Sequence, residues 1–167
     1  QYLIRSVYNA YAGISRFDRE CMNTTGIVSH GPPIEGQALM RVNKTLYIAG
    51  SHMSGWSPNS AVFGPTLSAS LPGAKWSLAA AYNPSGSPMT FGTQSSFIFP
   101  FTHPDGHTTF IWMADRWNMG IPQPLPGGLH NWTSVWLPLL PPKPSIAAAQ
   151  PEAGWELRLK ACDLSLI

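Results

Sequence analysis

Residues 31–56 read GPPIEGQALMRVNKTLYIAGSHMSGW, and this stretch carries the clearest structural pattern in the chain. A turn rich in Pro and Gly leads to Glu35, and two short apolar runs then flank the polar pair Asn43 and Lys44. Short β-branched and apolar runs around a tight polar turn are typical of a β-hairpin. The stretch therefore predicts a hairpin over residues 36–51, with its turn at Asn43 and Lys44 and with Glu35 at its mouth.

Glu35 is the lone carboxylate at this strand start. The ends of strands are where an all-β fold can present chemistry, because the ladder fixes the backbone while the side chain points into a cleft. An ordinary solvated glutamate in a loop would show the same local pattern. The hairpin alone leaves both interpretations open.

The composition indicates an all-β protein. Seven Trp, seven Phe and five Tyr occur together with 17 Pro and 15 Gly, and helices would exclude most of those prolines. With 44% hydrophobic and 11% charged residues, the 167-residue chain can bury a core. No apolar run approaches the roughly 20 residues that span a bilayer. The ten basic residues are scattered singly, which argues against a nucleic-acid partner.

Short β-branched and aromatic runs recur along the chain with turns between them. Such spacing fits a sandwich, a barrel or a propeller. Groups of strands that begin near residues 37, 94 and 134 favour a repeated, blade-like unit, and no helix is predicted with confidence. Besides the hairpin, strands are predicted at 2–7, 13–18, 61–71, 76–82 (or a helical turn), 95–99, 108–117, 134–140 and 155–159, whereas 19–33, 83–89 and 118–131 are expected to be turns or loops.

Three glycosylation sequons, at Asn23, Asn43 and Asn131, favour the secretory pathway. No charged and apolar leader precedes Gln1, so we expect the start to be truncated and the signal peptide to lie outside this chain.

Two cysteines, Cys21 and Cys162, could pair with each other or each could have a partner outside the chain. No Cys/His spacing typical of a metal site occurs, and no cofactor is expected.

Three motifs together identify a family resemblance: EGQALMRVNKTLYIAGSHMSGWSPN at 35–59, TQSSFIFP at 93–100 and FIWMADRWN at 110–118. With them the chain resembles glycoside hydrolase family 43, and it looks closest to the galactan 1,3-β-galactosidase (exo-β-1,3-galactanase) branch over residues 2 to about 140. The resemblance implies a five-bladed β-propeller with its site at the centre of one face, of which about three blades are present. Residues 1–140 would form the partial propeller. Residues 141–167, a Pro/Ala-rich loop and a terminal strand, could close the last blade.

The resemblance also implies roles for two residues. Glu35 in Glu-Gly-Gln matches the family's general acid, although Gln37 replaces a Pro. Gln94 in Thr-Gln-Ser-Ser-Phe matches the Gln that is thought to hold the attacking water, which requires an imidic-acid tautomer or a purely positional role because a neutral amide is a very poor base. Otherwise Gln94 is a strand-start amide bonded to backbone. The Asp base and the Asp that tunes the acid in most of the family would lie upstream of Gln1.

Cleavage of a glycosidic bond needs an acid on the leaving oxygen and a group on the far side of the ring to direct water. Pro33, Ile34 and Trp56 are expected to shield Glu35 partly from water, which suits a proton donor. Asp115 offers a second carboxylate, but the sequence Ala-Asp-Arg-Trp is interpreted more simply as an ion pair with Arg116 at a strand end.

The sugar contacts expected from the resemblance and from side-chain chemistry are Asn9, His52, Ser54 and Trp56. Asn9 and Ser54 fall where the branch places polar groups for the terminal galactose, and His52 could serve as well as Ser54. The indole of Trp56 could stack on a galactose face. Trp112 could do the same, but we expect it to fill the core.

The sequence thus predicts a secreted, extracellular, inverting glycosidase that removes terminal β-1,3-linked galactose from galactan or arabinogalactan side chains. Its partner would be a polysaccharide or oligosaccharide substrate, with no nucleic acid and no membrane, and its oligomeric state is left open. One alternative is a truncated carbohydrate-binding remnant without activity. Another is a related arabinan or xylan hydrolase, which an upstream Asp base would favour. An open propeller also leaves unpaired blade faces, which predicts poor solubility unless a partner or a further segment covers them.

Overall fold

The computed structural model describes residues 1–55, 57–66, 70–76, 81–117, 132–141 and 155–158. Within these ranges the chain forms strands and one short 3-10 turn at Thr90–Gly92, and none of the described helices is long and apolar enough to cross a membrane. The prediction of an all-β protein is confirmed.

The strands form three antiparallel sheets. The first sheet comprises β1 (Tyr2–Val7), β2 (Tyr11–Phe17) and β3 (Thr24–His30), in that order. The second comprises β4 (Glu35–Val42), β5 (Thr45–Ser51) and β6 (Ala61–Pro65). The third comprises β7 (Thr93–Thr102), β8 (Thr108–Trp117), β9 (Trp132–Leu140) and β10 (Glu156–Leu157), with β7 at one edge and β10 at the other.

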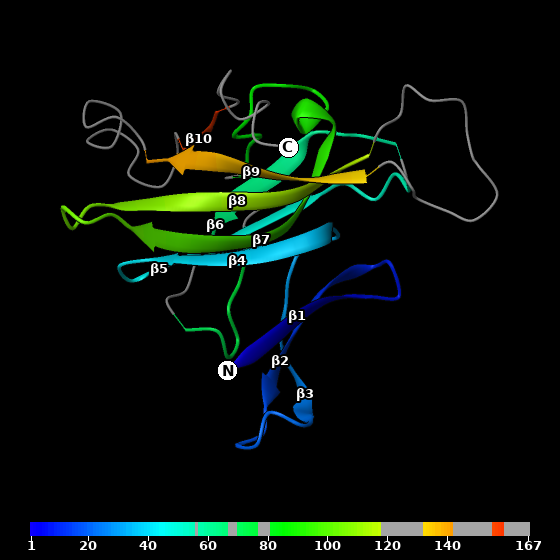
Figure 1. The fold of residues 1–167 in the computed structure, drawn as a ribbon. Coiled ribbons are helices and arrows are strands. Elements are labelled where there is room, and N and C mark those ends of the chain that lie inside the picture. Colours follow the sequence, from blue (N-terminus) through cyan, green and yellow to red (C-terminus); the bar gives the residue numbers. More distant parts are fainter. Residues whose placement is uncertain (56, 67–69, 77–80, 118–131, 142–154, 159–167) are drawn as a thin grey trace.

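The three sheets stack face to face in chain order, with the β1–β3 sheet lowest in Figure 1. Strand β5 explains why the second sheet lies between the other two. All of its apolar residues are buried, and they point alternately to the two neighbouring sheets. Leu46 and Ile48 pack against the first sheet, whereas Tyr47 and Ala49 pack against the third. The stacked sheets are three consecutive blades of a partial β-propeller.

The largest core lies between the second and third blades. Trp112 is fully buried at its centre, and its ring lies 6.5 Å from that of Phe63 across the interface. Tyr47 stacks on Phe63 at 5.3 Å and meets Trp155 edge-on, so aromatic rings join β5, β6, β8 and the segment before β10. The prediction that Trp112 fills the core is confirmed.

The hairpin of residues 36–51 is confirmed, with its turn at Asn43 and Lys44. Asn43 has a φ of 53°, which is the left-handed conformation that Asn tolerates better than most residues. The prediction of a strand at 108–117 is confirmed to the residue.

Residues 24–30 were expected to belong to a turn-rich segment, and that expectation is wrong because they form β3. The pairing of β3 with β2 is interrupted by two register shifts, and Gly26 has a φ of +104°. Both features break the period-two alternation by which a strand is usually found in a sequence.

The strand expected at 61–71 ends earlier, at Pro65. In the expected strand 76–82, Trp76 and Tyr82 form isolated bridges to Thr66 and Phe63, and residues 77–80 lie outside the described ranges. The division of the chain near residue 140 stays a prediction, although β10 pairs with β9 and extends the third blade.

Candidate active site

Glu35 and Gln94 lie at the starts of β4 and β7, which are edge strands of neighbouring blades and contact each other. Each strand begins its own blade, so the two starts lie at the same end of the stack. The fold therefore brings together two side chains that are far apart in the sequence.

Ser51 links the two residues. It is buried at the end of β5, directly opposite Glu35 in the strand register, and its hydroxyl donates to the Glu35 carbonyl oxygen at 3.4 Å. Gln94 Nε2 donates to the same hydroxyl oxygen at 2.8 Å. Because the Ser51 proton is directed at Glu35, the oxygen is left to accept from the amide, and this bond orients the Gln94 carboxamide.

The backbones of the two strand starts also meet closely at Gly36. Its φ is +59°, and a Cβ at this position would lie 2.7 Å from both Gln94 Cγ and the Ser95 carbonyl oxygen. Ser95 Oγ donates to the Gly36 carbonyl oxygen. Glycine is therefore required here for two reasons, the left-handed backbone and the lack of space for a side chain.

The Glu35 carboxyl group is half-buried, and its Oε1 atom is inaccessible to solvent and has no hydrogen-bond partner among the described residues. Pro33 is exposed, and Ile34 points into the core beside Ile48 and Val62. Gln37, which replaces the family's Pro, donates from Nε2 to the Ile34 carbonyl oxygen and so braces the bulge that contains Glu35.

Asn9 lies exposed at the tip of the β1–β2 hairpin, with a φ of 51°. The strand directly after that tip is attached to the segment before Glu35, since Ala12 N donates to the Pro32 carbonyl oxygen at 2.8 Å and Gly31 N donates to the Ala12 carbonyl oxygen at 2.6 Å. The hairpin tip therefore lies at the same end of the molecule as Glu35.

His52 and Ser54 lie in an exposed loop that begins directly after Ser51. Asn59 shapes this loop: its side chain accepts from His52 N at 3.0 Å and donates to His52 O at 2.7 Å. Ser54 Oγ donates to the Ser57 carbonyl oxygen at 2.6 Å. Trp56 lies outside the described residues.

Asp115 does not pair with Arg116 among the described residues, so the predicted ion pair is wrong. Adjacent residues in a strand point to opposite faces, which keeps the two charges apart. Asp115 instead lies opposite Gln94 in the register of β7 and β8, half-buried on the same face of the blade.

Among the described residues, hydrogen bonds from His107 lower the pKa of Asp105 at the far end of β7, and a hydrogen bond with Glu156 raises the pKa of Arg158. Among the residues that the structure describes, no group of three or more His, Cys, Asp and Glu side chains could hold a metal ion.

The fold defines a class of protein: consecutive propeller blades, with the polar side chains Glu35 and Gln94 at the starts of the first strands of the second and third blades. The solved structures that it resembles are exo-β-1,3-galactanases and β-1,3-galactosidases of glycoside hydrolase family 43, which confirms the resemblance drawn from the three motifs.

An exo-β-1,3-galactanase from Clostridium thermocellum is 25% identical to the chain with a TM-score of 0.73, and the match covers 95% of this chain and 31% of that one. An exo-β-1,3-galactanase from Phanerochaete chrysosporium, solved with β-1,3-galactotriose, is 25% identical with a TM-score of 0.68, over 94% and 32% of the two chains. A family 43 β-1,3-galactosidase solved with galactodeoxynojirimycin is 24% identical with a TM-score of 0.70, over 95% and 41%.

The chain thus spans 31% and 32% of the length of the two exo-β-1,3-galactanases and 41% of the length of the β-1,3-galactosidase. No protein-family model and no curated protein matches it.

Proposed function

We propose that this chain is part of an inverting glycoside hydrolase that releases terminal β-1,3-linked galactose from galactan or arabinogalactan side chains. In this proposal the chain supplies the general acid and the residue that positions the attacking water. The observation that carries the proposal is the placement of Glu35 and Gln94 at the starts of the neighbouring edge strands β4 and β7, linked by hydrogen bonds through Ser51. Further support comes from the exo-β-1,3-galactanase and the β-1,3-galactosidase that share this fold.

In this proposal Glu35 is the general acid. Its carboxyl proton moves to the glycosidic oxygen as the bond from that oxygen to the anomeric carbon breaks. A half-buried carboxyl whose Oε1 has no partner among the described residues is free to turn toward a bound sugar. Gln94 holds the attacking water through its Oε1 atom, because its Nε2 is engaged with Ser51. A neutral amide is a very poor base, so we assign it to positioning the water, whose proton passes to solvent.

The substrate is a polysaccharide or oligosaccharide that ends in galactose. Exposed polar groups at the same end of the molecule, those of Asn9, His52 and Ser54, are available to its hydroxyl groups. We assign the protein to the secretory pathway, with glycans at Asn23 and Asn43. Both side chains are exposed, as an acceptor must be, whereas Asn131 lies outside the described residues.

A carbohydrate-binding remnant without activity is the second candidate. It is favoured by one observation, the exposed polar side chains of Asn9, His52 and Ser54, which suit the binding of a sugar without any chemistry. A remnant would keep the polar groups at this end of the blades without the remaining walls of an active site.

The test is to express the gene with all coding sequence that flanks these residues and to incubate the product with β-1,3-galactotriose. Proton NMR during the first turnovers should show galactose released as the α-anomer, which is the inverted product. Binding of the trisaccharide without cleavage would favour the remnant. Cleavage of arabinan or xylan, with no cleavage of the galactotriose, would favour the alternative of a related arabinan or xylan hydrolase.

A further inference from the structure

The turn between β1 and β2 has a backbone that one of its residues does not favour. Tyr8 and Asn9 have φ values of 52° and 51°, so two consecutive residues without a glycine are left-handed. Ala10 N donates to the Val7 carbonyl oxygen at 2.9 Å and closes the turn. Turns with two left-handed residues usually have Asn, Asp or Gly at both positions. Asn9 fits this preference, whereas a bulky residue such as Tyr8 is an outlier.

The Tyr8 side chain gains nothing from packing that would offset this strain. It is 97% exposed, more than any other large apolar side chain in the described ranges, of which Met22 follows at 79%. Within those ranges its hydroxyl group has no hydrogen-bond partner and its ring has no aromatic partner. A strained position that stability does not explain points to a role in function.

The tip of this hairpin is held at the Glu35 end of the molecule. Tyr11, which follows the tip, stacks flat on His30 of β3, with the ring centroids 4.7 Å apart and 7° between the planes. Next to it, Ala12 is bonded to the segment before Glu35, and a Cβ on Gly31 would lie 3.0 Å from Ala12 Cβ. The aromatic ring at the tip is therefore presented by a fixed support and not by a long loop.

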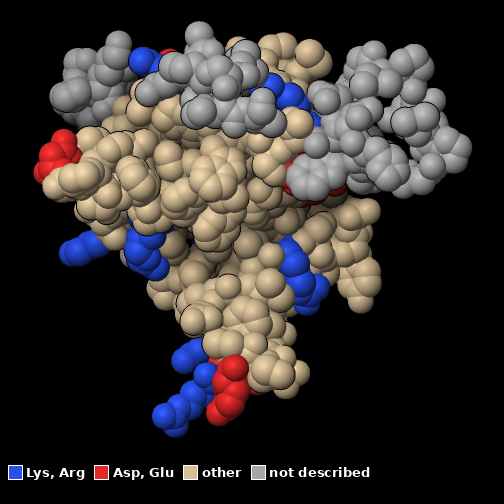
Figure 2. Space-filling view, viewed as in Figure 1, with Lys and Arg blue, Asp and Glu red and all other residues tan. Residues whose placement is uncertain are grey.

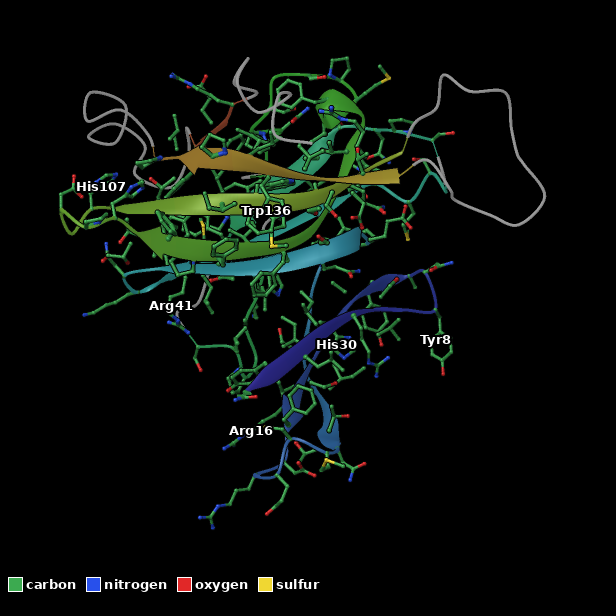
Figure 3. The ribbon with its side chains drawn as sticks, in the orientation of Figure 1. Tyr8, Arg16, His30, Arg41, His107 and Trp136 are labelled. Carbon is green, nitrogen blue, oxygen red and sulfur yellow. The ribbon has the colours of Figure 1, made fainter. Side chains whose placement is uncertain are left out.

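The figures place this ring beyond the hairpin. In Figure 3 Tyr8 extends past the tip, on the side of β1 that faces away from β4. The surface at the same place in Figure 2 is tan, with no charged side chain over it. The ring therefore offers a flat, neutral surface outside the immediate neighbourhood of Glu35 and Gln94.

We propose that Tyr8 is a stacking platform for a galactose unit on the leaving-group side of the cleaved bond, more than one unit away from the terminal galactose. One face of galactose presents mainly C–H groups, which can pack on an aromatic ring while the hydroxyl groups stay in water. An enzyme that removes terminal units binds the end of the chain at its catalytic groups, so the rest of the chain must pass over the surface beside them. The inference rests on the proposed function, because it extends the same site along the substrate.

The platform makes affinity depend on the length of the substrate chain. A disaccharide with its terminal unit at Glu35 ends before it reaches Tyr8, whereas a hexasaccharide extends over the ring. The tyrosine should therefore strengthen the binding of long chains and leave that of short ones nearly unchanged.

The test measures the binding of β-1,3-galactobiose and β-1,3-galactohexaose to the longer gene product by calorimetry, with Glu35→Gln present in every protein to prevent cleavage. Tyr8→Asn should weaken hexasaccharide binding about 5-fold to 10-fold and disaccharide binding less than about twofold, whereas Tyr8→Trp should keep both. Tyr2→Asn is the matched control, because Tyr2 is also exposed, at 39%, but lies at the opposite end of β1. It should change neither affinity by more than about twofold.

Thermal unfolding separates this role from a structural one. Tyr8→Asn should leave Tm unchanged or raise it, because Asn suits a left-handed turn better than Tyr does. A Tm lower by more than about 5 °C would show that the ring packs against the longer product and would overturn the proposal. Unchanged hexasaccharide binding in Tyr8→Asn, or an equal loss in Tyr2→Asn, would overturn it as well.

The two proposals can fail separately. If the protein with Glu35 intact cleaves β-1,3-galactotriose but Tyr8→Asn binds the hexasaccharide normally, the hydrolase stands and the platform is overturned. If that protein cleaves nothing but binds the hexasaccharide through Tyr8, the platform stands and the hydrolase is overturned. A protein that does not bind the hexasaccharide at all overturns the platform whatever its activity.

Discussion

Single side chains at the Glu35 end divide into those that would do chemistry and those that hold them in place. Gln94 has little freedom, because Gly36 lies against its Cγ and Ser51 receives its amide nitrogen. Ser51 is therefore the residue through which the orientation of Gln94 can be altered without touching Gln94 itself.

Ser51→Ala removes the acceptor for Gln94 Nε2 and frees the carboxamide to rotate. Loss of one hydrogen bond of this kind costs about 1 kcal/mol, which corresponds to a roughly fivefold lower kcat with KM little changed. Steady-state kinetics on β-1,3-galactotriose measure this. Ser96→Ala is the matched control, because among the described residues Ser96 Oγ bonds only the Met113 carbonyl oxygen, on an exposed part of β7. Equal losses in the two variants would contradict the positioning role of Ser51.

A site residue could be predicted from the sequence when it belongs to a local motif, and not when its role depends on contacts with distant segments of the chain. Glu35 and Gln94 each stand in a recognisable motif. Ser51 and Asn59 were missed, because their importance comes from partners on other segments rather than from a local pattern. The ion pair expected for Asp115 failed for a simpler reason, since neighbours in a strand face opposite ways.

At the scale of elements, the bulge at the start of β4 aims Glu35. The register of β4 and β5 shifts between Glu35 and Ala38, and Gly36 takes its left-handed conformation within that shift. The regular hairpin beyond it follows directly from sequence alternation. The bulge does not, because Glu-Gly-Gln by itself indicates a turn as readily as a kinked strand.

Gly36→Ala is expected to destabilise the fold by about 2–4 kcal/mol, since it adds a steric clash to the cost of a left-handed backbone. Gly55→Ala is the matched control: its φ is +61°, close to that of Gly36, but nothing lies within 4 Å of the added Cβ. It should cost only about 1–2 kcal/mol. Denaturant unfolding measures the difference, and a Gly36→Ala loss no larger than that of Gly55→Ala would contradict the close approach of β4 and β7.

Strand β3 shows the limit of sequence reasoning for elements. Its residues include β-branched side chains, but bulges and a left-handed glycine interrupt the alternation, so the pairing partner rather than the pattern makes it a strand. By contrast β8 has long apolar runs between two clear turns and was predicted to its end residues.

At the scale of the whole molecule, stability depends on the interface between the second and third blades. Trp112→Ala would leave a cavity at its centre and should cost about 3–5 kcal/mol. Tyr8→Ala, at a side chain that is 97% exposed, should cost less than about 0.5 kcal/mol. Thermal and denaturant unfolding of the two variants measures this, and similar stabilities would show that the two blades do not share a core.

In the proposed mechanism Glu35 is the general acid and Gln94 holds the attacking water. The kinetics of Glu35→Gln and Gln94→Ala in the longer gene product, on β-1,3-galactobiose and on a β-galactoside with an activated aryl leaving group, test these two roles. Glu35→Gln should lose roughly 100-fold to 10,000-fold on the disaccharide, the contribution of a general acid, and recover most of it on the aryl substrate, which needs no proton. Gln94→Ala should be slow on both, because a good leaving group does not replace a missing water. Equal recovery of the two variants, or full activity of Glu35→Gln on the disaccharide, would contradict this account.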